Sequence, residues 1–171
     1  MEDIEVPTEH LHETIKEKTE EARETEKKWV MSLAISTALV AVLAAIAGLL
    51  AGHHSNEALI EQIRASDQWA YYQAKGIKAE IKSLQIGGAD HSADVEKYRK
   101  EQKQIQTAAR AHEKLSEDHL EKHVLLAKSV TLFQITIAVS AISILTRRKW
   151  LWYLGLVFAL FGVFCFISGL L

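Results

Sequence analysis

Apolar and polar residues follow one another in long blocks along this chain. Three blocks are almost wholly apolar, and they cover about residues 29–52, 124–146 and 150–171. A run of about 18 or more apolar residues is long enough to cross the roughly 30 Å hydrocarbon layer of a membrane. The charged residues gather instead in 1–28 and 53–123. The pattern therefore predicts an all-α integral membrane protein with three transmembrane helices.

The polar segment 53–123 has the periodicity of two helices. Its arms, at about 54–86 and 91–123, are separated by Gly87-Gly88 followed by Asp90, which is a turn signal near 87–90. In both arms, the residues expected at the contact recur at alternating spacings of three and four, which is the spacing of a coiled coil. We expect a long antiparallel coiled-coil hairpin, inserted between the first and second spans.

The spacing also predicts which residues meet inside the hairpin. The first arm contributes Ile60, Ile63, Asp67, Ala70, Ala74, Ile77, Ile81 and Leu84. The second arm contributes Val95, Tyr98, Gln102, Ile105, Ala109, His112, Ser116, His119 and His123. Because both arms rise at about 1.5 Å per residue, folding at the glycines pairs positions whose numbers sum to about 175.

Two features of the hairpin are candidate sites. Asp67 falls beside Arg110 in this pairing, and a partly buried ion pair there would fix the register of the arms. A catalytic role for the carboxylate lacks a nucleophile or a second acid. Trp69 and Tyr72 fall off the predicted seam with Gly76, which favours a contact between subunits or with a partner protein. The alternative is packing against the flank of the hairpin itself.

Small residues recur along two of the membrane spans, where they let helix backbones approach closely. In the first span they are Ala34, Ala38, Ala41, Ala45, Gly48 and Gly52, and in the third they are Gly155, Ala159, Gly162 and Gly169. We interpret both rows as helix–helix interfaces, although alanine is also simply common in membrane helices. In the second span Thr136, Ser140 and Ser143 share one face, which raises the alternative of a polar path in an oligomer.

The histidines suggest a further hypothesis. His119 and His123 lie one helical turn apart, and the fold-back brings them towards His53 and His54. Imidazoles at such spacing can chelate zinc or another transition metal, or respond together to pH. No HExxH motif or cysteine pair accompanies them, and the sequence indicates no other cofactor. The single cysteine, Cys165, excludes an intramolecular disulfide.

Basic residues set the expected orientation. The loop 147–149 is Arg-Arg-Lys, and Lys27 and Lys28 precede the first span, so the positive-inside rule assigns the loop and the amino terminus to the cytoplasm. The hairpin and the carboxyl terminus then face outward. The charged helical leader 1–28 is too long and too acidic for a cleaved signal peptide. A net charge of −2 argues against a general affinity for nucleic acid.

The stretch Asp67-Gln-Trp-Ala-Tyr-Tyr-Gln-Ala-Lys75, preceded by His53-His54-Ser55-Asn56-Glu57, resembles a family of small bacterial membrane proteins labelled only as domain of unknown function 4337. The resemblance extends over most of the chain, with a charged leader, a span, a hairpin and two closing spans. It implies a bacterial inner-membrane protein, and it supplies no activity and no catalytic residues.

Together these features predict a non-enzymatic, self-associating protein whose hairpin serves as an assembly or partner-interaction module. No Gly-rich phosphate loop, nucleophile elbow or paired-carboxylate arrangement indicates an enzyme. The alternatives are an oligomeric channel or transport accessory, or a histidine-based metal or pH sensor at the membrane surface. The expected partners are the lipid bilayer and further copies of the chain.

Overall fold

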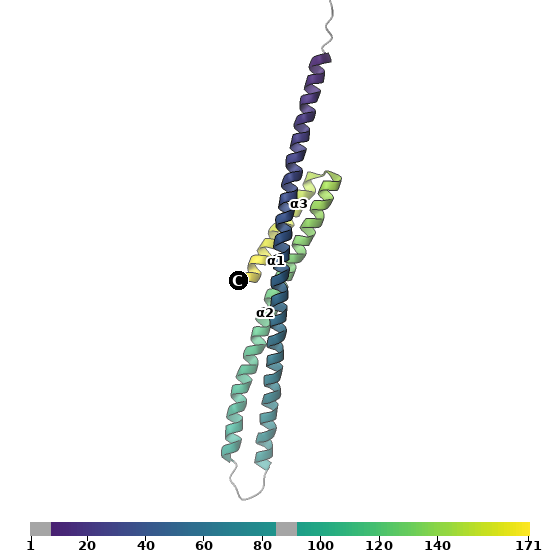
Figure 1. The fold of residues 1–171 in the computed structure, drawn as a ribbon. Coiled ribbons are helices and arrows are strands. Elements are labelled where there is room, and N and C mark those ends of the chain that lie inside the picture. The colour runs from purple at the N-terminus through teal and green to yellow at the C-terminus, as the bar shows by residue number, and fades with distance from the viewer. Residues whose placement is uncertain (1–7, 85–91) are drawn as a thin grey trace, which may run out of the picture.

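The residues that the structure describes form three helices (Figure 1). A computed structural model describes residues 8–84 and 92–171 and contains α1 (Thr8–Leu84), α2 (Ser92–Thr146) and α3 (Lys149–Leu170). Each helix includes a stretch long and apolar enough to cross a membrane. The predicted all-helical fold with three such stretches is confirmed, whereas the turn expected near 87–90 lies outside the described residues.

The first helix is unbroken for 77 residues, or about 115 Å at a rise of 1.5 Å per residue. The leader, the first span and the first arm, which the sequence analysis treats as separate segments, are therefore parts of one rod. No proline interrupts it, since the only proline of the chain is Pro7. Its isolated glycines each cost roughly 1 kcal/mol of helix propensity, too little to break a helix of this length.

The three apolar stretches lie at one level of the molecule. In Figure 1, α2 runs antiparallel beside α1, and α3 turns back beside the upper half of α2. At one end of α3, the Arg147 guanidinium lies 3.4 Å from Glu26 of α1. At the other end, Lys122 Nζ donates a hydrogen bond of 3.3 Å to the Leu171 carbonyl. The 22 residues of α3 span about 33 Å, close to the thickness of the hydrocarbon layer.

The α2–α3 contact is built on small residues. Gly155, Ala159 and Gly162 are all buried, and α3 packs mainly on α2. A Cβ on Gly162 would lie 2.7 Å from Cε1 of the fully buried Phe133, so the close approach depends on glycine. The small-residue row of the third span is thus a helix–helix interface, but it lies within one chain.

The hydroxyl face of α2 is turned towards α3. Thr136 Oγ1 donates to the Gly155 carbonyl at 3.1 Å, and Ser143 Oγ donates to the Arg148 carbonyl at 2.9 Å. Ser140 is buried between them. Thr136 and Ser143 are thus bonded to backbone and enclosed within one chain, and the polar path in an oligomer stays a prediction.

In the contact between α1 and α2, the α2 residues are the predicted ones and the α1 residues are not. All the predicted α2 positions are buried or partly buried, from Val95 to His123. On α1, however, the predicted seam is exposed: 53% of Ile63 and 61% of Ile77 are accessible. The buried positions of α1 are instead Trp29, Leu33, Val40, Ala47, Ala51, Ala58, Glu61, Ala65 and Ala79.

The reason lies in the polar side chains of α2, which need hydrogen-bond partners once they are buried. Ser116 Oγ donates to the Ala58 carbonyl at 2.8 Å, and Gln102 Nε2 donates to the Tyr72 carbonyl at 3.1 Å. A small residue such as Ala58 leaves the α1 backbone within reach of such donors. Isoleucine on this face would hold the two helices apart, so the aliphatic residues occupy the other side of α1.

Because α1 turns a different face towards α2 than predicted, the sites predicted for the hairpin need correction. Asp67 and Arg110 are both exposed, and no ion pair joins them within the part of the chain that the structure describes. Trp69 and Tyr72 are partly buried and touch edge to face, with ring centroids 5.5 Å apart. Gly76 faces Gln102 of α2. The inference that Trp69, Tyr72 and Gly76 point away from the hairpin is therefore wrong.

Candidate functional site

The polar core of the α1–α2 contact is centred on Glu61. This residue is only 6% exposed and lies on the α2-facing side of α1. Its carboxylate accepts a hydrogen bond from His112 Nδ1 of α2 and another from Arg64 Nη1, each 2.5 Å long. The hydrogen bond from His112 is the main cause of a lowered pKa for the Glu61 carboxyl, with a smaller contribution from Arg64 against the opposing effect of burial.

A second ion pair between α1 and α2 lies nearer the C-terminal end of α1. Lys75 Nζ is 2.5 Å from Glu101 Oε2 and stands over the rings of Tyr71 and Tyr98, at 5.2 and 5.3 Å from their centroids. The bond to Glu101 raises the pKa of Lys75, and the same bond lowers the pKa of Glu101. Pairs of this kind fix which residues face each other more than they add stability. Glu61 and Lys75 thus have the register role expected of Asp67.

The four histidines named by the sequence analysis are not gathered into one cluster among the described residues. His54 Nδ1 and His119 Nδ1 lie 2.9 Å apart, and the rings of His53 and His54 are 5.4 Å apart. His123 Nδ1 donates to the Ala51 carbonyl at 2.8 Å, so this nitrogen is engaged. Within residues 15–84 and 93–171, no group of three or more metal-ligating side chains could hold an ion.

The His54–His119 contact requires at least one neutral ring, because a hydrogen bond between two nitrogens needs one bare acceptor. Burial is the main cause of a lowered pKa for His54. The neighbouring charges of His119, His53 and Lys122 lower it further, and Glu57 opposes them. The pair therefore favours the neutral state of His54.

The opposite side of α1 carries a row of small and aliphatic residues, interrupted by the polar Asn56 and Asp67, which we call the outer stripe. Its members are Ala34, Ala38, Ala41, Ala45, Gly48, Gly52, Ile60, Ile63, Asp67, Ala70, Ala74, Ile77 and Ile81, and all are exposed. At about 100° per residue, these positions lie about half a turn from the buried face. The small-residue row of the first span is thus free within one chain and continues into the predicted hairpin seam.

The lower part of the outer stripe is unusual because it lies beyond the apolar level of the helix. Ile60, Ile63, Ile77 and Ile81 are each at least 40% exposed, and they recur at the spacing of a coiled coil. Exposed aliphatic residues that recur on one side of a helix, flanked by charged residues, are typical of a protein–protein contact.

Residues 29–171 match the model of one protein family, described as Domain of unknown function (DUF4337). The chain belongs to that family. The DUF4337 region starts within α1 and includes the outer stripe, the polar core and both closing helices. No curated protein and no solved structure is detectably similar to the chain.

Sequence reasoning missed the α2-facing side of α1, although a signal for it is present in the DUF4337 region. Alanine recurs every seven residues at Ala44, Ala51, Ala58 and Ala65, and again at Ala79. A repeat of seven keeps one face of a helix towards its partner. An alanine repeat that alternates with polar residues predicts close, hydrogen-bonded packing. The isoleucine repeat on the other side of α1 is more hydrophobic, so it gives the stronger signal for a buried face.

Proposed function

We propose that this protein is a non-enzymatic, self-associating protein of the bacterial inner membrane. Its three apolar stretches cross the bilayer, and the paired arms of α1 and α2 form a hairpin that extends from it. The amino terminus and the loop 147–149 lie in the cytoplasm, and the hairpin and the carboxyl terminus lie on the outer side. The assembly surface is the outer stripe of α1, and the partner is a second copy of the chain.

The observation that carries this proposal is that exposed small and aliphatic residues recur on one side of α1, both before and after Asn56. Small residues such as Ala45 and Gly48 support close helix packing within lipid, where there is no hydrophobic force between helices. Aliphatic residues such as Ile63 and Ile77 follow on the same side in the polar segment, where burial of apolar surface drives association. The same face of α1 thus carries small residues suited to association in lipid and aliphatic residues suited to association in water.

The membrane also restricts how two copies can meet. Copies inserted in the same orientation bring their α1 helices together in parallel, so that equal residue numbers face each other around a symmetry axis. A parallel coiled coil uses the three-and-four spacing of the outer stripe. Asp67 would then lie near its counterpart, and this acidic residue would weaken the assembly and fix its register.

Cysteine cross-linking tests the proposed contact. In a Cys165→Ala background, Ala45→Cys places a thiol on the outer stripe, and Ile46→Cys places one on an exposed position about 100° away. Oxidation of isolated membranes with copper phenanthroline is expected to give a covalent dimer for Ala45→Cys and little for Ile46→Cys. Equal cross-linking of both variants, or none with Ala45→Cys, would contradict the proposal.

A response to pH at the histidine pair is the second candidate function. The supporting observation is the 2.9 Å contact between Nδ1 of His54 and Nδ1 of His119, which does not tolerate protonation of both rings. Acidification would open this contact at the base of the hairpin. The proposed measurement is the exchange rate of backbone amides around residue 54 at pH 7.5 and 5.5; equal protection would remove this candidate.

A further inference from the structure

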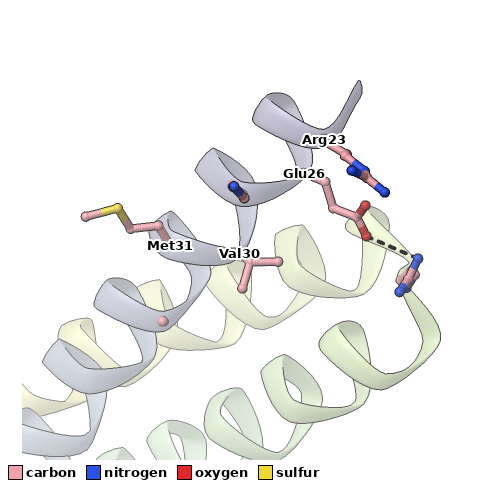
Figure 2. Close-up of a pocket in the computed structure, with 7 residues that line it drawn as sticks. Arg23, Glu26, Val30 and Met31 are labelled. Atoms are coloured by element: carbon pink, nitrogen blue, oxygen red, sulfur yellow. Dashed lines mark ion pairs between the residues drawn. The ribbon is translucent and has the colours of Figure 1, made fainter. Parts of the chain in front are cut away.

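A basic groove lies where α1 leaves the apolar level, beside the turn between α2 and α3 (Figure 2). Its walls come from α1 and from that turn, and they border an open hollow of about 580 Å³. The lining residues are Arg23, Glu26, Lys27, Val30, Met31, Ala34 and Arg147. Three of these side chains are cationic and one is anionic, so the groove is net positive.

Charge and hydrophobicity are separated along this groove. Arg23 and Lys27 lie towards the charged end of α1, and Val30, Met31 and Ala34 follow towards the apolar stretch. Met31 is 65% exposed, and it extends away from the helix in Figure 2. A cationic upper wall above an apolar lower wall is complementary to an amphiphile with an anionic headgroup.

Arg147 closes the groove from the α2–α3 turn. Its backbone has φ of 53°, a left-handed conformation that glycine or asparagine adopts more readily. This turn brings the guanidinium 3.4 Å from Glu26, which neutralises the one acidic residue of the lining and leaves Arg23 and Lys27 uncompensated there.

A second hollow continues on the far side of the Glu26–Arg147 pair, lined among others by Lys18, Trp29 and Lys149. Lys149 Nζ lies 5.9 Å from the centre of the Trp29 ring. Trp29 is buried, and its indole N–H has no hydrogen-bond acceptor among the described residues. Glu21 and Glu26 also line this second hollow, so it is net positive only through the excess of Lys18, Arg147 and Lys149.

We propose that this groove binds the headgroup of an anionic phospholipid. The phosphodiester lies between Arg23, Lys27 and Arg147, and an acyl chain follows Val30, Met31 and Ala34 into the bilayer. Basic pockets between transmembrane helices, at the level of the headgroups, are known to suit anionic lipids. The inference depends on the proposed membrane placement and is independent of self-association.

The test compares lipids and variants by native mass spectrometry of the full-length protein in detergent. Phosphatidylglycerol and phosphatidylcholine with identical acyl chains are titrated separately, and the bound fraction is measured for each. The test variant is Lys27→Gln with Arg147→Gln. The matched control is Lys28→Gln with Arg148→Gln, which removes the same charge from the same two segments at positions outside the groove lining.

The expected result is a preference for phosphatidylglycerol that falls about tenfold or more in the test variant and less than about twofold in the control, since each of the two removed basic contacts contributes roughly fivefold. Equal losses in both variants would mean that overall charge, and not the groove, attracts the lipid. Equal binding of the two lipids by the unaltered protein would also overturn the proposal.

Arg23→Gln provides an independent measurement if the double variant does not fold, because Arg23 is exposed and lines the groove from α1 alone. It is expected to reduce phosphatidylglycerol binding without changing the helical circular dichroism signal. Unchanged binding in this folded variant would contradict the proposal. Cross-linking through Ala45→Cys, measured in parallel, reports on self-association, so failure of one proposal is distinguishable from failure of the other.

Discussion

Replacing Ile77 by lysine tests whether the outer stripe holds copies of the chain together. Complete burial of an isoleucine side chain contributes about 1.5–3 kcal/mol, and 61% of Ile77 is exposed in the single chain. Burying that part would contribute roughly 1–2 kcal/mol for each copy, or about 2–4 kcal/mol for a symmetric pair. Ile77→Lys removes this term, and it is expected to raise the dissociation constant by about 30- to 700-fold.

The measurement is the molar mass of the detergent-solubilised protein by light scattering over a dilution series. Gln73→Lys is the matched control, because it adds the same charge one turn away at an exposed position outside the outer stripe. The control is expected to change the dissociation constant by less than about threefold, in keeping with the small effect of single surface charges. If Ile77→Lys and Gln73→Lys behave alike, the reasoning from the outer stripe is wrong.

Three further predictions concern other parts of the two faces of α1. Asp67→Asn is expected to strengthen self-association, because it removes the repulsion between equal residues of parallel helices; unchanged molar mass on dilution would place Asp67 away from the contact. Ala58→Leu is expected to destabilise the fold by about 1–3 kcal/mol through overpacking and the lost bond from Ser116, as measured by thermal unfolding. Stability is expected to decrease as the pH falls below about 6.5, because the pKa of His54 is lowered in the folded protein, so that the unfolded chain binds protons first. The decrease should be smaller in His54→Gln, and an identical pH profile of unfolding temperature would contradict this assignment.

The sequence predicts the parts of the fold that follow from apolar run length and helical spacing, and it fails where burial depends on polar partners. The apolar runs and the three-and-four spacing are strong signals, and the three helices and the α2 side of the contact follow them. The α1 side does not, because the usual preference for isoleucine over alanine at a buried position assumes an apolar partner. Here the facing residues include Ser116 and His112, which need oxygen atoms within hydrogen-bond distance.

A related reason explains why the sequence did not reveal the polar core around Glu61. Glu61 is a glutamate between an isoleucine and a glutamine, and nothing local distinguishes it from a solvated residue. Its burial depends on His112, which is distant in sequence and near only after α2 has folded back. Asp67 attracted attention because it interrupts an aliphatic row, and that row lies on the other side of the helix. The residue pattern of one helix therefore cannot indicate polar partners that are distant in the sequence.

The two faces of α1 divide the work of folding and assembly between different physical terms. The α2-facing side combines alanine with buried hydrogen bonds, which fix one register between α1 and α2. The outer stripe lacks such polar partners and relies on apolar area, which accepts a second copy without strict directional requirements. Because the lipid groove includes Ala34, the first residue of that stripe, a bound phospholipid would lie at the edge of the contact between copies. Anionic lipid should then alter the cross-linking of Ala45→Cys less than that of a thiol placed at Ala38, which is nearer the groove.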